Sequence, residues 1–335
     1  MITDARALQR SFVPQELQHR DGQISYLSAA LKPITQNSPG EHVFIHGPSG
    51  AGKTTLARHV AERLEATAFG FRWGYVNCMS DSSTNAVLQR LVRDTGLAAH
   101  LSTDGTPASE FYDQFRSYDG QLLVILDEVD CLEDESVLHA LYDMPNVTMV
   151  VITIDEDNML ARCDSRVRSR LQSMTTVALE KYTLAQLVDI LRARIRAGLA
   201  PGVITSAAIA EIADRAAGDA REAIAMLRQA VMVVDSSPEP KITVDVVHRV
   251  EDDAREEIRR DRVDDLGTHK RLLYDIIDAA GKIGVTELRE TYEQRCSVPK
   301  AGSTRRRYLA SLEEKYELIA SSGNGRGKTY RVTEP

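Results

Sequence analysis

The sequence has few cysteines, no long hydrophobic run and no apolar segment at its N-terminus. The four cysteines lie far apart, without a CxxC pair or a Cys/His cluster: Cys78, Cys131, Cys163 and Cys296. This spacing argues against a metal site or a disulfide framework, and a reducing cytoplasm is the expected compartment. No run of about 18 apolar residues is present, and the polar start MITDARALQRSFVPQ lacks a signal-peptide core. We therefore expect no membrane span and a cytoplasmic protein.

Lysine is also scarce, because the chain has 9 lysines against 32 arginines, with a net charge of −8. An acidic chain rich in arginine is typical of either a GC-rich genome or a salt-rich cytoplasm. The net charge argues against a surface that binds nucleic acid everywhere. The charge is uneven, however. Residues 265–335 carry 13 Lys and Arg against 10 Asp and Glu, a net of +3, which leaves −11 for residues 1–264.

A length of 335 residues predicts two or three domains. Residues 1–176 alternate apolar β-type runs, such as EHVFIHG and QLLVILDEVD, with amphipathic helical patterns, which predicts a parallel α/β sheet. Residues 177–260 have apolar residues at a helical spacing, and Thr183 is the predicted N-cap of the first helix. The charged stretch EDDAREEIRRDRVDD is either a solvated helix or a linker.

The pattern of residues 261–335 predicts a small domain of its own. HKRLLYDIIDAAG is a predicted helix ending at Gly281, VTELRETYEQRC a second helix capped by Thr286, and GSTRRRYLASLEEKYELI a third that runs into a strand. The tail SSGNGRGKTYRV then supplies a glycine-rich turn and a last strand. Three helices and a terminal hairpin predict a winged helix-turn-helix domain.

The segment GPSGAGKT, residues 47–54, matches the pattern G-x-x-x-x-G-K-[ST] between a predicted strand and a predicted helix. Glycines let backbone N–H groups wrap phosphates, and the helix N-terminus adds positive potential. Lys53 would reach the β- and γ-phosphates, and the Thr54 hydroxyl would ligate Mg²⁺. The alternative is a glycine loop without a ligand, which the strand-and-helix context disfavours.

Two acidic residues follow the apolar strand of LLVILDEVD. Asp127 could hold Mg²⁺ through water, so Thr54 and Asp127 are the predicted metal residues. Glu128 could orient or deprotonate an attacking water. The alternative is an acidic strand end that caps the next helix, and the presence of the glycine loop upstream argues against it.

Arginines at two further places could serve the same site. SRVRSRL contains Arg166 and Arg170, which could reach the γ-phosphate bound to a neighbouring subunit, or could form a surface cluster. GDAREA contains Arg221 at a predicted helix start, from which it could fold onto the phosphates, or lie on an exposed helix face.

These residues together resemble the AAA+ ATPases, and most closely the archaeal origin-recognition, cell-division-control family of replication initiators. FVPQELQHRDGQISYLSAALKP resembles the family's opening, YTLAQLVDILRARI its lid entry and GDAREAIAMLRQA its second sensor. The resemblance covers nearly the whole chain. It implies an AAA+ P-loop parallel sheet with a helical lid, followed by a winged helix-turn-helix domain that binds DNA.

The resemblance implies bound ATP or ADP with Mg²⁺. The phosphates would lie on the loop residues Gly47, Pro48, Ser49, Gly50, Ala51, Gly52, Lys53, Thr54 and Thr55. The adenine would lie near Val13 and Pro14, and Tyr182 and Arg194 on the lid would complete the pocket. Arg221 would sense the phosphates. Arg170 is the first choice for an arginine finger and Arg166 the second.

One position departs from the family pattern. The family usually has a polar sensor, often asparagine, at the end of the strand NVTMVVITI. The aligned residue is Ile154, or Asp155 if the alignment slips by one. Isoleucine cannot donate a hydrogen bond to the attacking water or the γ-phosphate, and aspartate would repel the phosphate. This departure predicts slow hydrolysis without loss of nucleotide binding.

The C-terminal arginines predict contact with double-stranded DNA, and the family resemblance implies that this DNA is a replication origin. A winged helix usually places its third helix in the major groove and its wing against the minor groove. The third helix carries Arg305, Arg306 and Arg307, and the wing carries Arg326 and Lys328. The alternative is a winged helix that mediates protein contacts, with its arginines in solvent.

The favoured function is an ATP-dependent initiator that recognises origin DNA and helps recruit the replicative helicase, with self-association on DNA and a nucleoid-associated location. One alternative is a DNA-binding regulator that has lost hydrolysis, which Ile154 favours. The other is a signalling ATPase whose winged helix only packs internally. Such proteins normally add long repeat arrays, whereas this sequence ends ten residues after Gly325.

Overall fold

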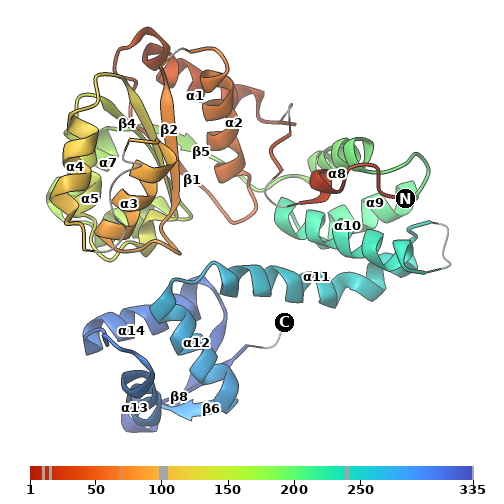
Figure 1. Cartoon of the computed structure of the whole chain (residues 1–335). Helices are drawn as coiled ribbons and strands as arrows, with labels where there is room; N and C mark the ends of the chain where they lie inside the picture. The colour runs from red at the N-terminus through yellow and green to blue at the C-terminus, as the bar shows by residue number, and fades with distance from the viewer. Residues whose placement is uncertain (10–11, 15–16, 69, 98–104, 238–240, 334–335) are drawn as a thin grey trace. The chain divides into compact units, whose positions relative to one another are not determined.

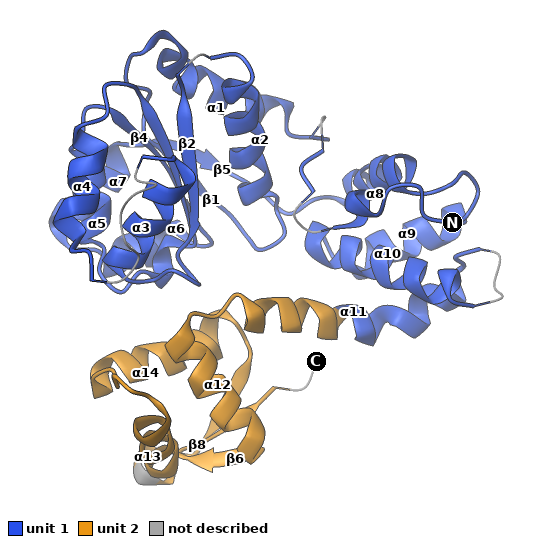
Figure 2. Cartoon of the chain, in the orientation of Figure 1, with its two compact units in different colours: residues 1–254 blue, residues 255–335 orange. Residues whose placement is uncertain are grey.

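The computed structural model describes the chain except for residues 10–11, 15–16, 69, 98–104, 238–240 and 334–335, and except for the side chain of Arg326. The chain forms two compact units, residues 1–254 and residues 255–335 (Figure 2). Within the described ranges, we find no helix with the length and apolar character needed to span a membrane.

A five-stranded parallel sheet organises the first unit (Figure 1). Its order is β2-β3-β4-β1-β5. The strands are β1 (Val43–His46), β2 (Arg72–Asn77), β3 (Leu122–Asp127), β4 (Val147–Thr153) and β5 (Thr175–Ala178). Every residue of β3 and β4 is buried. Burial on both faces explains the continuous apolar runs in the sequence, and the predicted parallel sheet is confirmed.

Helices pack against both faces of this sheet. They are α1 (Asp21–Leu31), α2 (Lys53–Glu65), α3 (Thr84–Asp94), α4 (Ala108–Arg116), α5 (Ser136–Tyr142), α6 (Glu156–Arg162) and α7 (Ser165–Ser173). The helices α1 and α2 share a buried cluster with alternate residues of β1 and β3, including Val43, Ile45, Leu123 and Ile125. Figure 1 shows α3, α5 and α7 on the other side of the strands. The loop between β1 and α2 therefore lies at the carboxyl edge of the sheet, where parallel α/β folds bind ligands.

A helical lid follows the sheet in the same unit. It contains α8 (Leu184–Gly198), α9 (Ser206–Arg215), α10 (Ala220–Asp235) and the start of α11 (Val244–Asp264). Thr183 caps α8 as predicted, in a reciprocal capping box with Gln186. The N-terminal residues pack on the lid, because Ile2 bridges to Leu199 and the short helix η1 (Ala5–Leu8) lies against α8.

The second unit contains helices and a small antiparallel sheet. Its elements are the end of α11, α12 (Thr268–Ala280), β6 (Lys282–Gly284), α13 (Val285–Arg295), α14 (Gly302–Ala310) with a π-turn (Ser311–Lys315), β7 (Ile319–Ser322) and β8 (Thr329–Val332). The sheet order is β6-β8-β7. This arrangement is consistent with the predicted winged helix-turn-helix.

The structure of the second unit differs from the sequence predictions at two places. It also decides between the two alternatives, helix or linker, for the charged stretch that precedes the unit's first full helix. Thr286 is not a cap, because α13 begins at Val285 after Gly284. The strand β6 has three residues, too short to give a strand pattern, and its pairing with β8 could not be foreseen. The charged stretch of residues 251–264 is helical, as part of α11.

Candidate nucleotide-binding and DNA-binding sites

The glycine loop has the backbone shape that a phosphate cradle requires. Gly47, Gly50 and Gly52 have φ values of 145°, 69° and 89°, which side chains rarely allow. A Cβ at Gly47 would overlap the backbone carbonyl of Leu179. The helix α2 begins at Lys53, directly after the loop, so its first backbone N–H groups and the positive end of its dipole lie at the loop.

Lys53 is held inside this loop. Its Nζ donates hydrogen bonds to the carbonyl oxygens of Gly47 at 2.6 Å and Pro48 at 2.8 Å. Burial lowers the pKa of Lys53, an effect that the carboxylates of Asp127 and Glu128 oppose. The carbonyls orient the ammonium group toward the loop, as expected of a group that binds phosphate.

Oxygen atoms of Thr54 and Asp127 lie together beneath the loop. The Thr54 Oγ1 donates to Asp127 Oδ2 at 2.5 Å, and the Tyr75 hydroxyl donates to the same carboxylate oxygen at 3.1 Å. Burial raises the pKa of Asp127, and so does the neighbouring Glu128. A hydroxyl and a carboxylate in this position fit Mg²⁺, which prefers oxygen ligands. Tyr75 was missed from the sequence, because only the register of β2 with β3 brings it beside this strand.

Glu128 follows Asp127 in a strained backbone conformation. Its φ of 54° and ψ of 45° lie in the left-handed region, which costs a non-glycine residue about 1–3 kcal/mol. Its backbone N–H donates to Asp127 Oδ1 at 2.9 Å. Backbone strain of this kind is concentrated at functional sites, and the Glu128 side chain is half-buried.

The lid contacts the loop through the start of α10. The Ala220 N–H donates to the Gly50 carbonyl at 3.2 Å, and a Cβ at Gly50 would overlap the Asp219 carboxylate. Asp219 caps α10, accepting from the backbone N–H of Arg221 at 2.7 Å. The positive charge of Arg221 lies close enough to Lys53 to contribute to lowering the pKa of that lysine. The backbone of Arg221 thus lies at the end of the lid that contacts the loop, and its role toward the phosphates stays a prediction.

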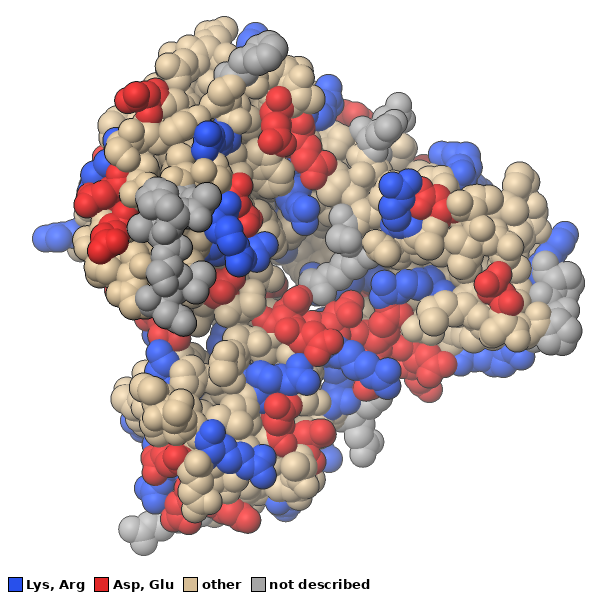
Figure 3. Space-filling model, viewed as in Figure 1, with Lys and Arg blue, Asp and Glu red and all other residues tan. Residues whose placement is uncertain are grey.

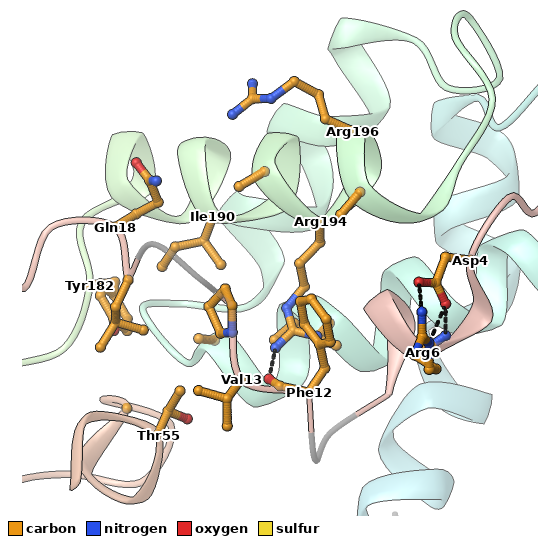
Figure 4. A pocket seen from close by; sticks show the side chains of 17 residues that line it. Asp4, Arg6, Phe12, Val13, Gln18, Thr55, Tyr182, Ile190, Arg194 and Arg196 are labelled. Atoms are coloured by element: carbon orange, nitrogen blue, oxygen red, sulfur yellow. Dashed lines mark hydrogen bonds and ion pairs between the residues drawn. The ribbon is translucent and has the colours of Figure 1, made fainter. Parts of the chain in front are cut away.

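A cavity of about 670 Å³ opens between the loop, the N-terminal segment and the lid (Figure 4). Its size is that of a small-molecule or cofactor pocket. Six residues proposed from the sequence line it: Val13, Pro14, Gly52, Thr55, Tyr182 and Arg194. Phe12 and Ile190 add apolar surface, of the kind that an aromatic base requires.

Arg194 also lines this cavity but is turned toward the backbone. Its guanidinium donates to the carbonyl oxygens of Ala7, Gln9 and Phe12 at 2.8–3.2 Å. Burial lowers the pKa of Arg194 to about 10. The residue fastens the N-terminal segment to α8, and so shapes the wall of the cavity (Figure 4).

Three residues follow β4 at the position where the sequence predicted no polar sensor. Ile154 is half-buried, and the Asp155 carboxylate caps α6 by accepting from the backbone N–H of Asn158 at 3.1 Å. Glu156 instead pairs with His46, the last residue of β1, with 3.1 Å between His46 Nε2 and Glu156 Oε2. Glu156 was missed because it is the first residue of a helix, beyond the strand end at which the sensor was sought.

The two candidate finger arginines differ in their surroundings. Arg170 forms a bidentate pair with Asp143, at 2.9 Å and 3.1 Å to its Oδ1, and lies over the Tyr142 ring. Arg166 is exposed on the same helix, α7. The first choice from the sequence is therefore held within its own chain, and the second is accessible.

In the second unit, the basic residues of α14 are not equivalent. Arg305 is 14% exposed, pairs with Glu293 at 2.5 Å and lies over the Tyr292 ring. Arg306 and Arg307 are exposed. Arg305 thus stabilises the packing of α14 on α13, which leaves Arg306 and Arg307 as the accessible pair.

The hairpin carries the remaining predicted DNA residues. Lys328 is partly exposed, 3.7 Å from Glu313. The backbone of Arg326 lies in the turn Gly325–Gly327, while its side chain is outside the described part of the structure. The exposed Lys282 and Arg331, opposite each other on β6 and β8, were not singled out from the sequence. Figure 3 shows acidic and basic side chains interspersed over the visible face.

A parallel sheet in this strand order, a glycine loop before a helix, paired acidic residues after β3 and a helical lid on the loop define a nucleotide-binding P-loop protein of the AAA+ class. A family model for an AAA domain matches residues 36–159, and one for a Cdc6 AAA+ ATPase-type lid domain matches residues 188–252.

Named relatives narrow this class. The chain is 36% identical to ORC1-type DNA replication protein 9 of Halobacterium salinarum over 335 residues, covering 100% of this chain and 94% of that protein. It is 37% identical to ORC1-type DNA replication protein 1 of the same organism over 301 residues, covering 90% and 98%. Among solved structures, the Aeropyrum pernix ORC1 protein in complex with DNA matches with a TM-score of 0.74 and 25% identity, covering 99% of this chain and 93% of that one. The chain belongs to the family of ORC1-type DNA replication proteins, which confirms the predicted family and fold class.

Proposed function

We propose that this protein is an ATP-binding initiator of DNA replication, which recognises origin DNA, helps recruit the replicative helicase and uses slow ATP hydrolysis as a switch. The observation that carries the proposal is the loop of residues 47–54 closed by the lid, in a chain whose second unit resembles a DNA-binding winged helix. Relatives named as DNA replication proteins, which match 100% and 90% of this chain, support it.

The nucleotide site supports ATP binding with its own residues. Lys53 and the N–H groups at the start of α2 would neutralise phosphate charge, and Arg221 would add a cation from the lid. Thr54 and Asp127 would hold Mg²⁺, and the hydrogen bond from Tyr75 would keep the Asp127 carboxylate oriented. When bound, Mg²⁺ stabilises the negative charge that develops on the phosphates.

Hydrolysis would depend on Glu128, which would orient or deprotonate the attacking water. Two features favour a slow rate. Ile154 provides no hydrogen bond at the end of β4, and Glu156 is engaged with His46. An arginine finger would have to come from a second copy, and the exposed Arg166 suits this role better than Arg170, which is paired with Asp143.

DNA binding would use the accessible cations of the second unit. Arg306 and Arg307 on α14 would enter the major groove, and Lys328 and Arg326 of the hairpin would follow the adjacent groove. Residues 265–335 carry a net charge of +3 in a chain of net charge −8, so this region attracts phosphate more than the rest of the chain does.

The same slow site supports a second candidate, a DNA-binding regulator that uses bound nucleotide without turnover. The test is to measure binding of the full chain to fragments of its own genome, with ATP and with ADP, and to footprint the selected fragments. An initiator should protect a site at a replication origin. Protection of promoters alone would favour the regulator, and uniform binding to all fragments would contradict both candidates.

A further inference from the structure

Arg20 is buried at the start of α1, where the N-terminal segment meets the sheet unit. Its side chain is only 5% exposed. One nitrogen, NH2, donates to the Ala51 carbonyl of the glycine loop and to the Glu180 carbonyl, both at 2.9 Å. The Nε atom donates to the Tyr182 hydroxyl at 3.2 Å. Three parts of the chain that are far apart in sequence thus meet on one guanidinium.

Tyr182 is fixed by this arginine against the glycine loop. The Arg20 guanidinium lies 4.1 Å from the centroid of the Tyr182 ring, in addition to the hydrogen bond to its hydroxyl. A Cβ at Gly52 would lie 2.7 Å from the Tyr182 hydroxyl, so the ring rests directly on the loop. Because Gly52 and Tyr182 both line the nucleotide cavity, any change in the ring changes the cavity.

Tyr182 also connects the loop to the phosphate-facing end of the lid. Its backbone N–H donates to the Gly218 carbonyl at 3.1 Å, next to Asp219, the cap of α10. The position of Arg221 at the start of α10 therefore depends on the same short segment that Arg20 holds. A shift of Tyr182 would move the loop and the lid relative to each other.

We propose that Arg20 is a positioning residue of the nucleotide site, which sets nucleotide affinity by locking Tyr182 and the glycine loop against the lid. The inference rests on the proposed nucleotide binding. It adds to the nucleotide site a residue that lies outside the glycine loop, outside the acidic end of β3 and outside the start of α10. Among the described residues, carbonyl oxygens and an aromatic ring surround the guanidinium, and no carboxylate pairs with it. Its positive charge therefore remains available to attract the polyphosphate of a nucleotide to the loop.

Lysine cannot reproduce this arrangement. A guanidinium donates in several fixed directions within one plane and stacks on aromatic rings, whereas an ammonium is a point charge on a flexible stem. Arg20→Lys keeps the positive charge and removes the planar set of hydrogen-bond donors. Tyr182→Phe keeps the ring and removes only the hydroxyl that Arg20 contacts.

The experiment measures dissociation constants for ADP and ATP, and kcat and KM for ATP, on the full chain well below its unfolding temperature. Arg20→Lys should weaken ADP binding by about tenfold, and Tyr182→Phe by about threefold to tenfold. The ADP affinity of the double variant should lie within about twofold of that of Arg20→Lys, because the two side chains act as a unit. We expect KM to rise and kcat to stay within about twofold of the parent value. Arg63→Ala, an exposed arginine on α2, is the matched control and should bind like the parent.

Three results would overturn the inference. Variants that lose thermal stability but bind ADP as tightly as the parent would show that Arg20 is structural only. Fully additive losses in the double variant would show that Arg20 and Tyr182 act separately. A parent chain that binds no nucleotide would contradict the proposed function and the inference together, whereas a parent that binds with unaffected variants would contradict the inference alone.

Discussion

Lys53 is the residue on which the nucleotide site depends most directly, because two loop carbonyls orient its ammonium group. We expect Lys53→Ala to abolish measurable ATP and ADP binding without unfolding the protein. The physical reason is that removing a buried charge-assisted donor from a phosphate site costs about 1.5–3 kcal/mol or more. Isothermal titration measures the binding, and circular dichroism checks that the variant is folded.

The matched control is Lys32→Ala, which removes an exposed lysine after α1 and should leave affinity unchanged. Unchanged ATP affinity in a folded Lys53→Ala protein would show that the glycine loop is not a phosphate site.

Glu128 tests the chemistry separately from binding. We expect the parent to turn over more slowly than kinases, whose rates are about 1–100 s⁻¹, because Ile154 cannot donate a hydrogen bond and Asp155 and Glu156 are engaged with other groups. Glu128→Gln should lower the remaining rate by about 10²-fold, since glutamine cannot accept the proton, and should leave ATP affinity intact. A phosphate-release assay measures the rate. A parent turnover of many per second without partners would contradict the role assigned to the β4 end.

At the scale of elements, the packing of α14 separates structural from DNA-binding arginines. We expect Arg306→Ala with Arg307→Ala to weaken DNA binding by about 1–3 kcal/mol for each base edge that an arginine reads in the parent protein. Arg305→Ala should instead lower the melting temperature of the protein, because Arg305 pairs with Glu293 and lies over Tyr292. Fluorescence anisotropy and calorimetry distinguish the two. If Arg305→Ala reduced DNA affinity as much as the double Arg306→Ala, Arg307→Ala variant, the assignment of Arg305 to packing would be refuted.

The lid helix α9 offers a test of local stability away from the nucleotide site. Thr205 caps this helix, accepting from the Ala208 N–H at 3.2 Å. Thr205→Ala should cost about 1 kcal/mol, or about 2–4 °C in melting temperature, and should not change ADP affinity. Calorimetry provides the measurement, with exposed Ser169→Ala on α7 as the control. A Thr205→Ala protein with the parent melting temperature would show that the cap is dispensable.

The same elements show how far the sequence could predict the structure. The sheet, the loop and the Thr183 cap were predictable, because apolar runs, glycines and cap residues act within a few positions of the chain. The strand β6 could not be predicted, since three residues are too few to show the alternation of apolar and polar residues that marks a strand. Tyr75, Arg20 and Glu156 were missed for another reason: each acts through an interaction with a distant segment, which only strand register and helix packing bring near.

At the scale of the whole molecule, the uneven distribution of charge agrees with the proposed functions, nucleotide binding by the first part of the chain and DNA binding by the last part. Residues 1–264 carry −11 and residues 265–335 carry +3, so the net charge of the first part disfavours the approach of DNA and that of the second part favours it. Low salt therefore exaggerates both effects, and affinities have to be compared at one ionic strength.

The central claim is that this chain recognises a particular DNA sequence through its second unit. The most direct measurement is the affinity of the full chain, with ATP bound, for its best genomic fragment and for a shuffled fragment at matched salt. The claim predicts a preference of about 10³-fold or more for the genomic fragment. The variant with alanine at Arg306, Arg307, Arg326 and Lys328 should lose that preference while keeping its ATP affinity. A parent that binds both fragments equally, or a variant that keeps the full preference, would contradict the account.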